Sequence, residues 1–580
     1  MRALRWALPY VGKYKWRLIF GQFINLINIA LQLVNPYFAG LIVANVIEGG
    51  QNDLLFRYLA IMIGITMYRT VARYWFLVLF ESTSQKVMFD MRRDVYDKLH
   101  RQNFTWFDKT RVGDTMSRMT GDLEAVRHFM AFDTYAIPEN ILLYIAAVIV
   151  MGTISWPLTG MMLLTTPFVV ILAIRQSKAI RPAFRTVREE FANLNSGAGE
   201  NISGNRVVKA FTKEEYEIEK FSKLNQNFYN ANMTAAGVRI KFFPLIESLA
   251  NILPLILLLM GGLFVIWGYL ELWQMVMLSG YLWMINNPTR MFTWCVNDLQ
   301  NTATSLDKIY EMMRAPIMIE SPAEAYSTAV KGAVEFKNVG FRYYTTENAG
   351  DVFNDISFSV KAGQTVGIVG DTGSGKTTLT SLIARFYEVS SGEVLVDGVN
   401  VKDFDLKTLR GSIAFAMQDV FLYSDTVEGN IAFGVPETPM ENVYKAAETA
   451  DANEFISAMP EGYETIVGER GVGLSGGQKQ RISLARAIAT DPSILVLDDV
   501  TSAVDTATEQ RIQTALADMK KIRERTTFIV AHRLASVKDA DLILVLSGGG
   551  ISERGTHEEL LAAKGYYRAQ WHEQNSGGGE

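Results

Sequence analysis

Residues 370–378 have the composition and order of a loop that holds phosphate groups. The segment GDTGSGKTT follows the apolar stretch TVGIVG and precedes the helix-forming stretch TTLTSLIARFYE, so a strand, a glycine-rich turn and a helix are predicted in that order. The glycines let the backbone wrap around phosphates, Lys376 reaches the β- and γ-phosphates of a nucleotide, and the Thr377 hydroxyl is a ligand for Mg²⁺. The predicted phosphate contacts are Gly370, Asp371, Thr372, Gly373, Ser374, Gly375, Lys376, Thr377 and Thr378.

A second phosphate-binding segment is predicted at residues 474–478, LSGGQ, which run directly into a helix expected from Lys479 to Thr490. A helix that begins in this way presents free backbone N–H groups and the positive end of its dipole, and both features suit an anionic phosphate. The residues assigned to this contact are Leu474, Ser475, Gly476, Gly477 and Gln478.

Two neighbouring carboxylates follow an apolar strand further along the chain. The strand ILVLD ends at Asp498, at a place where a Mg²⁺ ion bound to phosphates can be held. Asp499 comes directly after it. The segment SAVD, which ends at Asp505, then turns away from the strand.

The loop 370–378, LSGGQ, ILVLD and SAVD together resemble the Walker A, signature, Walker B and D-loop motifs of ATP-binding-cassette (ABC) ATPases. A P-loop kinase or GTPase needs the phosphate loop and the strand-end Asp but has no use for LSGGQ. The resemblance implies ATP and Mg²⁺ as cofactors. It also implies two such domains closed head to tail, so that each LSGGQ caps the ATP held by the other chain. Asp505 joins the ATP-binding set on the same basis.

Further assignments come from the same resemblance. Tyr343, after an early strand, would stack on adenine, and Gln418 would sense Mg²⁺ and the membrane domain. His532, at the end of TTFIVAH, would contact the γ-phosphate and the attacking water. The implied catalytic set is Asp499, His532, Gln418 and Lys376, and the implied Mg²⁺ ligands are Thr377, Gln418 and Asp498.

Asp499 departs from the family pattern, which has Glu at this position to polarise the hydrolytic water. The ordinary pKa values of Asp and Glu are close, at about 3.9 and 4.3, so basicity does not separate them. One methylene less withdraws the carboxylate by roughly 1.5 Å, and a misplacement of about 1 Å can lower a rate around 10²-fold. The ATP site on this chain's own Walker motifs is therefore expected to hydrolyse slowly.

An intact LSGGQ beside a weak carboxylate resembles the degenerate-site subunit of bacterial heterodimeric ABC multidrug exporters. The resemblance implies a second ABC half-transporter chain that supplies a competent Glu opposite this chain's LSGGQ; a homodimer is the alternative. The sequence shows no internal duplication, so the chain is expected to supply one half of a two-fold assembly.

The elements that must position these residues fall into two parts. Residues 333–573 are predicted to form an α/β P-loop ABC nucleotide-binding domain with a helical subdomain and early strands at VEFKNVGF and ISFSV. Residues 1–313 resemble the α-helical, exporter-type ABC membrane domain, with six apolar segments that each reach the roughly 20 residues needed to cross a bilayer. The predicted spans are 17–47, 54–80, 135–156, 158–176, 242–269 and 272–296. Residues 314–332 are a predicted linker and 574–580 a polar tail.

Basic residues indicate how these spans are oriented. The short loops after the third and fifth spans contain no Lys or Arg, whereas the long loops after the second and fourth are rich in both. Because basic loops stay cytoplasmic, the long loops, both termini and the ATPase domain are assigned to the cytosolic side of a bacterial inner (plasma) membrane. The long loops also have a helical, polar pattern, so the membrane helices are expected to continue well past the bilayer. On the resemblance, short turns near 104–114 and 201–211 would touch the ATPase domains.

Polar residues recur within the first span. Gln22, Asn25 and Asn28, followed by Gln32 and Asn35, are spaced every three or four residues and so share one helix face. They either hydrogen-bond between spans or form a polar wall of a transport cavity. Asn286 and Arg290 of the sixth span are further candidates for that wall.

Two arginines are predicted deep in the second span. Arg69 lies roughly 20 Å from the start of the span, and Arg73 follows on the same helix face, where the like charges repel. The pair either binds a carboxylate such as that of Glu247, or it lines the translocation path and favours substrates with an anionic or acceptor-rich part.

Composition narrows the choice of function. The net charge of 56 − 61 = −5 gives no argument for a nucleic-acid partner, and a single cysteine, Cys295, excludes an internal disulfide framework. The predicted function is that of an ATP-driven transporter subunit in the lipid bilayer, exporting drugs, lipids or other amphipathic small molecules. The alternatives are a siderophore-type importer with the exporter fold and an ATP-gated regulator or channel that does not pump.

Overall fold

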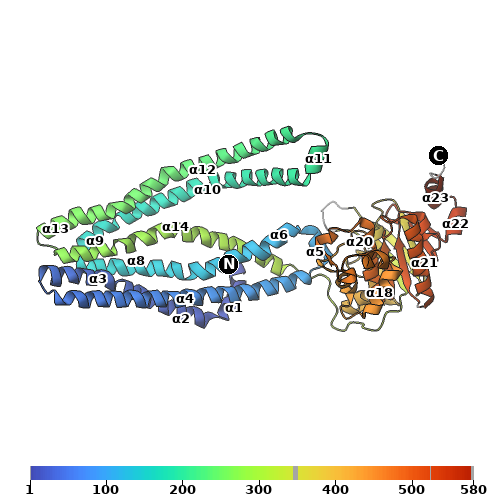
Figure 1. The fold of residues 1–580 in the computed structure, drawn as a ribbon, viewed down its shortest axis with the longest axis horizontal. Coiled ribbons are helices and arrows are strands. Elements are labelled where there is room, and N and C mark those ends of the chain that lie inside the picture. Colours follow the sequence, from blue (N-terminus) through green and yellow to red (C-terminus); the bar gives the residue numbers. More distant parts are fainter. Residues whose placement is uncertain (1, 344–349, 523, 577–580) are drawn as a thin grey trace. The chain divides into compact units, whose positions relative to one another are not determined.

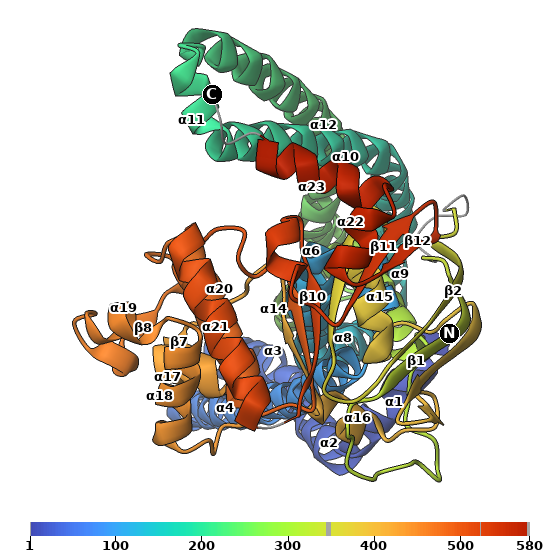
Figure 2. The ribbon, with the colours of Figure 1, turned by 90° about the vertical axis from the view of Figure 1, so that its right-hand side faces the viewer.

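The computed structural model describes residues 2–343, 350–522 and 524–576, and within these it leaves a few side chains undescribed (Figures 1 and 2). The chain divides into two compact units. Unit 1 comprises Met1–His100 and Gly113–Ala315, and unit 2 comprises Arg101–Val112 and Pro316–Glu580.

Unit 1 is built from helices, several of them very long (Figure 1). The predicted continuation of membrane helices beyond the apolar segments is confirmed, because α4, α10, α12 and α14 each extend far past them. The bounds are α1 (Arg2–Gly12), α2 (Lys15–Gln32), α3 (Val34–Leu41), η1 (Ile42–Glu48), α4 (Asp53–His100), α6 (Val112–Ser117), η2 (Arg118–Asp122), α7 (Leu123–His128), η3 (Phe129–Asp133), α8 (Thr134–Ile154), α9 (Trp156–Leu163), α10 (Thr165–Ser203), α11 (Asn205–Ala210), α12 (Glu214–Ile256), η4 (Leu257–Gly261), α13 (Gly262–Ile266) and α14 (Leu272–Arg314).

Five helical stretches among the described residues are long and apolar enough to cross a membrane. They are Lys15–Glu48, Asp53–His100, Val112–Ile154, Trp156–Ser203 and Glu214–Ile266, and they overlap the first five predicted spans. The sixth predicted span, 272–296, lies within α14 and is not among them. The count of six spans therefore stays a prediction.

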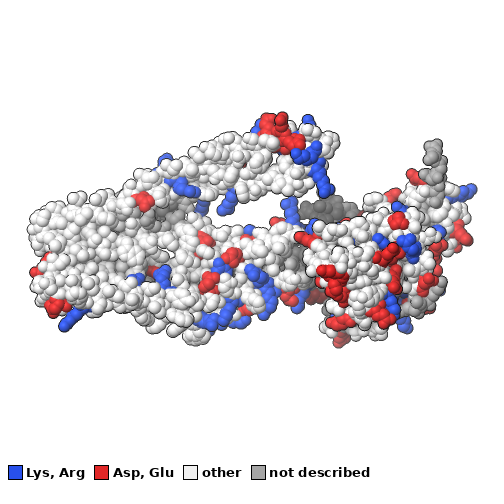
Figure 3. Space-filling model, viewed as in Figure 1, with Lys and Arg blue, Asp and Glu red and all other residues white. Residues whose placement is uncertain are grey.

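The helices of unit 1 pack around a buried apolar core while leaving much apolar surface outside. Leu143, Leu257 and Leu278 belong to this core, and the Tyr281 hydroxyl donates a hydrogen bond of 2.7 Å to the Leu33 carbonyl. Figure 3 shows a largely uncharged surface over the α3 and α13 end, with Lys and Arg gathered nearer the α11 end of α10 and α12. This distribution is that of a bundle whose apolar end lies in lipid.

Unit 2 is an α/β domain with the short helix α5 added from the first half of the chain. Its bounds are α5 (Phe104–Lys109), β1 (Val334–Phe341), β2 (Phe353–Val360), β3 (Thr365–Gly370), α15 (Lys376–Ile383), β4 (Ser391–Val396), β5 (Val399–Asn400), α16 (Leu406–Gly411), β6 (Ile413–Ala416), β7 (Asp425–Thr426), α17 (Val427–Ile431), η5 (Ala432–Gly434), α18 (Met440–Thr449), α19 (Asn453–Ser457), η6 (Gly462–Glu464), β8 (Ile466–Val467), η7 (Glu469–Gly471), α20 (Gly476–Ala489), β9 (Ile494–Asp498), α21 (Thr506–Ile522), β10 (Thr526–Val530), η8 (Leu534–Val537), β11 (Leu542–Ser547), β12 (Gly550–Gly555), α22 (His557–Ala562) and α23 (Tyr566–Ser576).

Two larger sheets form the frame of unit 2. A six-stranded sheet has the order β12-β11-β3-β10-β9-β6, and an antiparallel four-stranded sheet has the order β2-β1-β4-β5. The helices α17, α18 and α20 pack on one another through a separate apolar cluster that includes Val427, Val443 and Ile482, which corresponds to the predicted helical subdomain.

Parallel pairing brings four chain segments to one edge of the six-stranded sheet. β10 lies parallel to both β3 and β9, and β6 lies parallel to β9. The carboxyl ends of these strands therefore meet, and a ligand site outside the carboxyl ends is the usual outcome of such a sheet. The loop after β3, Asp498 at the end of β9, His532 beyond β10 and Gln418 beyond β6 all lie at this edge.

Candidate functional site

The loop between β3 and α15 has the backbone that the phosphate-binding motif requires. Gly375 has a φ of +93°, and an added Cβ there would lie 2.7 Å from the Phe353 ring, so only glycine fits. The Lys376 ammonium donates hydrogen bonds to the carbonyl oxygens of Gly370 at 2.8 Å and Asp371 at 2.9 Å. Burial lowers the pKa of Lys376, against the opposing effect of nearby carboxylates. A bound phosphate would therefore stabilise the charged form of Lys376 at this position.

One buried atom of this loop is available to a ligand. The Ser374 hydroxyl oxygen is shielded from solvent and has no hydrogen-bond partner among the described residues. A hydroxyl in this situation can donate to a phosphate oxygen, and doing so removes the cost of leaving it unsatisfied. The backbone, the ammonium group and the free hydroxyl of this loop are therefore suited to bind the phosphates of a nucleotide.

The two carboxylates after β9 lie in different surroundings. Asp498 is 5% exposed, and burial raises its pKa, with the neighbouring Thr377 hydroxyl acting in the opposite direction. A buried carboxylate beside that hydroxyl suits Mg²⁺ coordination, which supplies the compensating charge. Asp499 is partly exposed and has a left-handed backbone, with a φ of +50°. Its amide donates to the Val530 carbonyl at 3.0 Å, so the strand end of β10 fixes its position.

Asp499 and His532 line one small cavity of about 80 Å³ at the carboxyl edge of the sheet. His532 is exposed, and its loop is held by α23, since the Gln574 side chain donates to the His532 carbonyl at 2.9 Å and accepts from the Leu534 amide at 2.9 Å. Gln418 is likewise exposed, two residues beyond the end of β6. The structure thus gathers the predicted catalytic side chains at one edge.

The signature segment forms the start of α20 rather than a turn before it. The helix begins at Gly476, not at Lys479 as the sequence predicts, because Ser475 and Gln478 form a capping box. The Gln478 amide donates to the Ser475 hydroxyl at 3.3 Å, and the Ser475 amide donates to the Gln478 side chain at 2.9 Å. The first turn of α20, including the exposed Gly476, therefore presents its N-terminus outward.

Gln480 connects this helix to the Walker B and D-loop segment of the same chain. Its side chain donates to the Ser502 hydroxyl at 3.1 Å and accepts from the Ala503 amide at 3.1 Å. Asp505, at the end of the D-loop, caps α21 by accepting from the Thr508 amide at 2.9 Å. Sequence reasoning did not single out Gln480, although its position two residues after LSGGQ was a usable signal.

Tyr343 lies against the phosphate loop. Its hydroxyl is 2.8 Å from the Thr378 hydroxyl, and its ring packs edge-on against Phe341 at a centroid distance of 4.8 Å. A second tyrosine that the sequence did not indicate, Tyr566 of α23, donates to the Asp371 carboxylate at 2.7 Å. The C-terminal helix thus contacts both the phosphate loop and the His532 loop.

Helix α5, from the turn near residue 104, is packed within unit 2. The Phe104 ring stacks on Phe386 at a centroid distance of 4.7 Å and an interplanar angle of 29°. The Tyr387 hydroxyl donates to the Asp108 carboxylate at 3.0 Å. The expected contact of this turn with the ATPase domain is therefore present in the structure.

Unit 1 contains a polar cavity of about 330 Å³ around the two arginines of α4. Arg73 pairs with a carboxylate, that of Glu139, at 3.2 Å, as one of the two predictions for the arginines expects, and Arg69 donates to the Gln32 side chain at 2.7 Å. The cavity is lined by Gln32, Arg69, Arg73, Phe132, Tyr135, Ala136, Glu139, Asn140, Leu143, Trp283, Asn287 and Met291.

An apolar groove of about 420 Å³ adjoins this polar cavity, and the two share Asn140 and Met291. Its other lining residues include Ile137, Tyr144 and Leu299. Together the two spaces offer a charged, hydrogen-bonding end and an apolar end to one ligand.

Other residues predicted for the substrate path lie elsewhere or are not described. Asn25 and Asn28 are buried, and their side-chain nitrogens have no hydrogen-bond partner among the described residues. Gln22, Asn25, Asn28 and Asn286 are not among the described residues that line the polar cavity. The side chain of Arg290 lies outside the described residues. Their place on the path stays a prediction.

Models of two protein families match the chain. The model described as the ABC transporter transmembrane region matches residues 18–289, and the model described as ABC transporter matches residues 353–502.

Two bacterial proteins are similar along almost the whole chain. The ABC transporter ATP-binding protein YknU of Bacillus subtilis (strain 168) is 36% identical over 561 residues, covering 97% of this chain and 94% of that protein. YgaD of the same strain, whose name refers to multidrug export and to an ATP-binding/permease protein, is 33% identical over 575 residues and is covered to 98%. The similarity thus includes both the membrane and the ATPase parts.

A solved structure has the same fold over nearly its full length. It is that of a bacterial Atm1-family ABC exporter with ATP bound, with a TM-score of 0.80 and 25% sequence identity, and the match covers 98% of this chain and 99% of that one. A helical membrane domain followed by an ABC domain is therefore the architecture of this chain.

Proposed function

The chain belongs to the ABC transporter family, and from that premise we propose that it is one subunit of a heterodimeric exporter. Its ATPase domain and exporter relatives support ATP hydrolysis coupled to transport. The main support for a heterodimer is that one chain combines a complete signature, residues 474–478, with an Asp at position 499.

In the proposed division of the chain, residues 1–313 form the membrane domain, 314–332 the linker and 333–573 the ATPase domain. The relatives and the apolar helices support a multi-pass protein of the bacterial inner membrane, with the ATPase domain in the cytosol. On this proposal the six spans include residues 272–296 of α14.

ATP is held at the carboxyl edge of the six-stranded sheet. Its phosphates lie against the backbone of residues 370–378 and the Lys376 ammonium, and Tyr343 carries the adenine. Thr377, Gln418 and Asp498 would hold Mg²⁺, which would neutralise phosphate charge. The buried Asp498 carboxylate and the unpartnered Ser374 hydroxyl support this arrangement.

Asp499 orients the attacking water less well than Glu would. Hydrolysis at this site is therefore slow, and the ATP stays bound for a long time. His532 lines the same cavity as Asp499, and on this proposal its side chain would contact the γ-phosphate of the bound ATP. The expected deficit of around 10²-fold corresponds to about 2.7 kcal/mol of activation free energy. The competent site is then formed by the partner's Walker motifs and this chain's signature, where the outward N-terminus of α20 stabilises the partner's γ-phosphate.

Hydrolysis by the purified chain alone tests this proposal. The full-length chain in lipid nanodiscs with saturating Mg²⁺ and ATP is expected to turn over slowly, at a rate little above that of a Lys376→Ala variant. Brisk hydrolysis by the chain alone, lost in Lys376→Ala, would mean that two copies suffice and that the heterodimer is wrong. Stimulation by a transported compound, once the partner is present, separates a pump from a channel.

The two adjoining cavities of unit 1 support an amphipathic substrate with an anionic or acceptor-rich part. The polar cavity carries two guanidinium groups and one carboxylate, which leaves an excess of positive charge, and it also contains amides and aromatic rings. The neighbouring groove is apolar. An anionic head in the first and an apolar tail in the second match this pattern.

Replacing both arginines tests the substrate class. Arg69→Gln combined with Arg73→Gln is expected to raise the KM for anionic amphipathic compounds about 10-fold or more, because hydrogen bonds to charged groups contribute about 1.5–3 kcal/mol each. Cationic amphipathic compounds should lose less. Arg57→Gln, an exposed change on the same helix α4, is the matched control. Unchanged transport of both compound classes in the double variant would remove the arginines from the path.

A further inference from the structure

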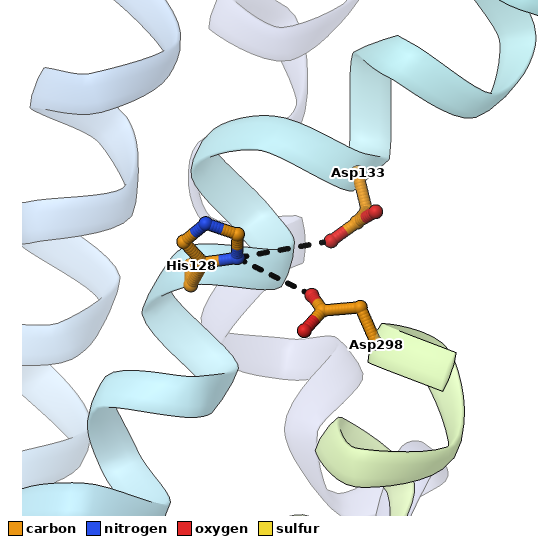
Figure 4. Close-up of side chains that lie close together, drawn as sticks. All are labelled: His128, Asp133 and Asp298. Atoms are coloured by element: carbon orange, nitrogen blue, oxygen red, sulfur yellow. Dashed lines mark hydrogen bonds and ion pairs between the residues drawn. The ribbon is translucent and has the colours of Figure 1, made fainter. Parts of the chain in front are cut away.

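Three side chains of unit 1 that can each coordinate a metal ion lie close together, outside both the ATP site and the polar cavity (Figure 4). His128 is the last residue of α7, Asp133 is the last residue of η3, and Asp298 lies in α14. One ligand atom from each lies within 4.8 Å of the other two. The His128 Nδ1 is 3.3 Å from the Asp298 carboxylate and 4.0 Å from that of Asp133.

Asp133 provides an independent sign that this cluster has a ligand. Its side chain is 0% exposed, and neither carboxylate oxygen has a hydrogen-bond partner among the described residues. Figure 4 shows the carboxylate directed toward His128 and Asp298. A buried carboxylate without hydrogen bonds is costly, and a bound cation removes that cost.

Charge balance favours a divalent cation over a simple ion pair. A protonated His128 between two carboxylates leaves the group with one negative charge, which is costly beside the buried Asp133. A doubly charged cation with a neutral imidazole brings the sum to zero. The cation also satisfies the carboxylate oxygens directly, which a single imidazolium N–H does not achieve for both acids.

The geometry and the ligand types match a first-row transition metal. Metal–nitrogen and metal–oxygen bonds of about 2.0–2.2 Å place neighbouring ligand atoms roughly 3–3.5 Å apart, close to the His128–Asp298 distance. The Asp133 carboxylate, 4.0 Å from the His128 Nδ1, needs to approach that nitrogen by under about 1 Å. One imidazole and two carboxylates form a mixed nitrogen and oxygen set of the kind that binds Zn²⁺ or Co²⁺.

Aromatic rings hold the imidazole in position. His128 stacks on Phe132 at a centroid distance of 6.0 Å and an angle of 28°, and it meets Trp294 edge-on at 5.8 Å. These two rings therefore hold the imidazole with its Nδ1 toward the acids, and neighbouring side chains orient metal-binding histidines in the same way. The His128 side chain is 45% exposed, which leaves a route for the ion and for water ligands.

We propose that His128, Asp133 and Asp298 form a divalent transition-metal site that ties the α7–η3 segment to α14. This site goes beyond ATP-driven export and does not depend on the identity of the partner chain or of the substrate. A metal bound here bridges two helical elements through ligands that are 165 positions or more apart in the sequence. Its binding stabilises the present packing of these elements and opposes any step that separates them.

Cobalt binding to the full-length chain tests the site. The protein is purified in detergent through a tag without histidines, treated with chelator, kept free of nucleotide and titrated with CoCl₂. We expect one Co²⁺ per chain, with visible d–d absorption bands that disappear on addition of ZnCl₂. His128→Gln and Asp298→Asn should each weaken Co²⁺ binding about 10-fold or more.

Matched controls separate this site from general metal binding. Asp307→Asn removes an exposed carboxylate of the same helix, and His100→Gln removes a histidine at the end of α4; both should leave the bands unchanged. The metal should also raise the Tm of the wild-type chain but not that of Asp298→Asn. Absence of the bands in the wild-type chain, or equal binding in Asp298→Asn and Asp307→Asn, would overturn the proposal.

Discussion

Two adjacent carboxylates illustrate how position decides the role of a residue. Asp498 ends β9 and is buried, so that burial raises its pKa and favours a cation beside it. Asp499 has left the strand, with a φ of +50°, and lines a cavity with His532. The first is suited to hold a metal and the second to face water. In the proposed heterodimer, the missing methylene at the second position is what separates a holding site from a hydrolysing one.

Two neighbouring glycines of the signature should respond differently to the same substitution. In Gly476→Ala the new Cβ lies 3.6 Å from the Ala503 Cβ, an ordinary contact, so the fold should be retained. The methyl group stands on the exposed first turn of α20, where it keeps the partner's phosphate away. Hydrolysis by the complex should therefore fall about 10²-fold.

Gly477→Ala is the steric comparison. Its Cβ would lie 2.8 Å from the Ala503 carbonyl oxygen, so the D-loop must shift, and stability should fall by about 1–3 kcal/mol. Thermal unfolding and ATPase assays of both variants distinguish the two effects. Full activity in Gly476→Ala would show that the signature does not act on a phosphate.

At the scale of elements, apolar runs between glycines were the most predictable features. The stretch TVGIVG coincides with β3, because a buried parallel strand is a short apolar run bounded by turn residues. The carboxyl edge with its predicted side chains follows from parallel pairing. Motifs and strand ends therefore predict residues that the fold brings to one edge, and their role in binding ATP stays a prediction.

Features that depend on the fold were less predictable. The sequence predicts the start of α20 too late, because two glycines are unfavourable in a helix. The capping box nevertheless fixes the first turn at Gly476. The pairing of Arg73 with Glu139 joins residues 66 positions apart, and the sequence pattern gives no register between α4 and α8. Tyr566 and the cluster around Asp133 have no local motif at all.

Helix α5 carries a prediction about coupling. Phe104→Ala removes the stacking on Phe386, so the helix should lose its hold on the ATPase domain. We expect stimulation of ATPase activity by a transported substrate to be lost while basal hydrolysis by the complex stays within about twofold, because the ATP site itself is unchanged. Val112→Ala, a change at a residue 76% exposed beyond the same helix, is the control. Retained stimulation in Phe104→Ala would exclude α5 from coupling.

At the scale of the whole molecule, both units expose surfaces that need another molecule to cover them. Large apolar side chains such as Phe56, Leu258 and Ile266 are exposed in unit 1, where lipid or a second chain covers them. The paired helices α10 and α12 lean away from the other helices toward α11 (Figures 1 and 2). In unit 2 the N-terminus of α20 also faces outward, and in the proposed complex it meets the ATP held by the partner chain. These features agree with a two-chain transporter.

The fate of ATP bound to this chain shows whether its own Walker site holds the nucleotide or hydrolyses it. The complex is purified from its native membranes through a tag on this chain and loaded with Mg²⁺ and 8-azido-ATP labelled on either the α- or the γ-phosphate. After a fixed interval it is photolabelled, and the two chains are separated on a gel. We predict that the wild-type chain retains the γ-label whereas Asp499→Glu retains only the α-label. Loss of the γ-label from the wild-type chain as fast as from Asp499→Glu would contradict the account.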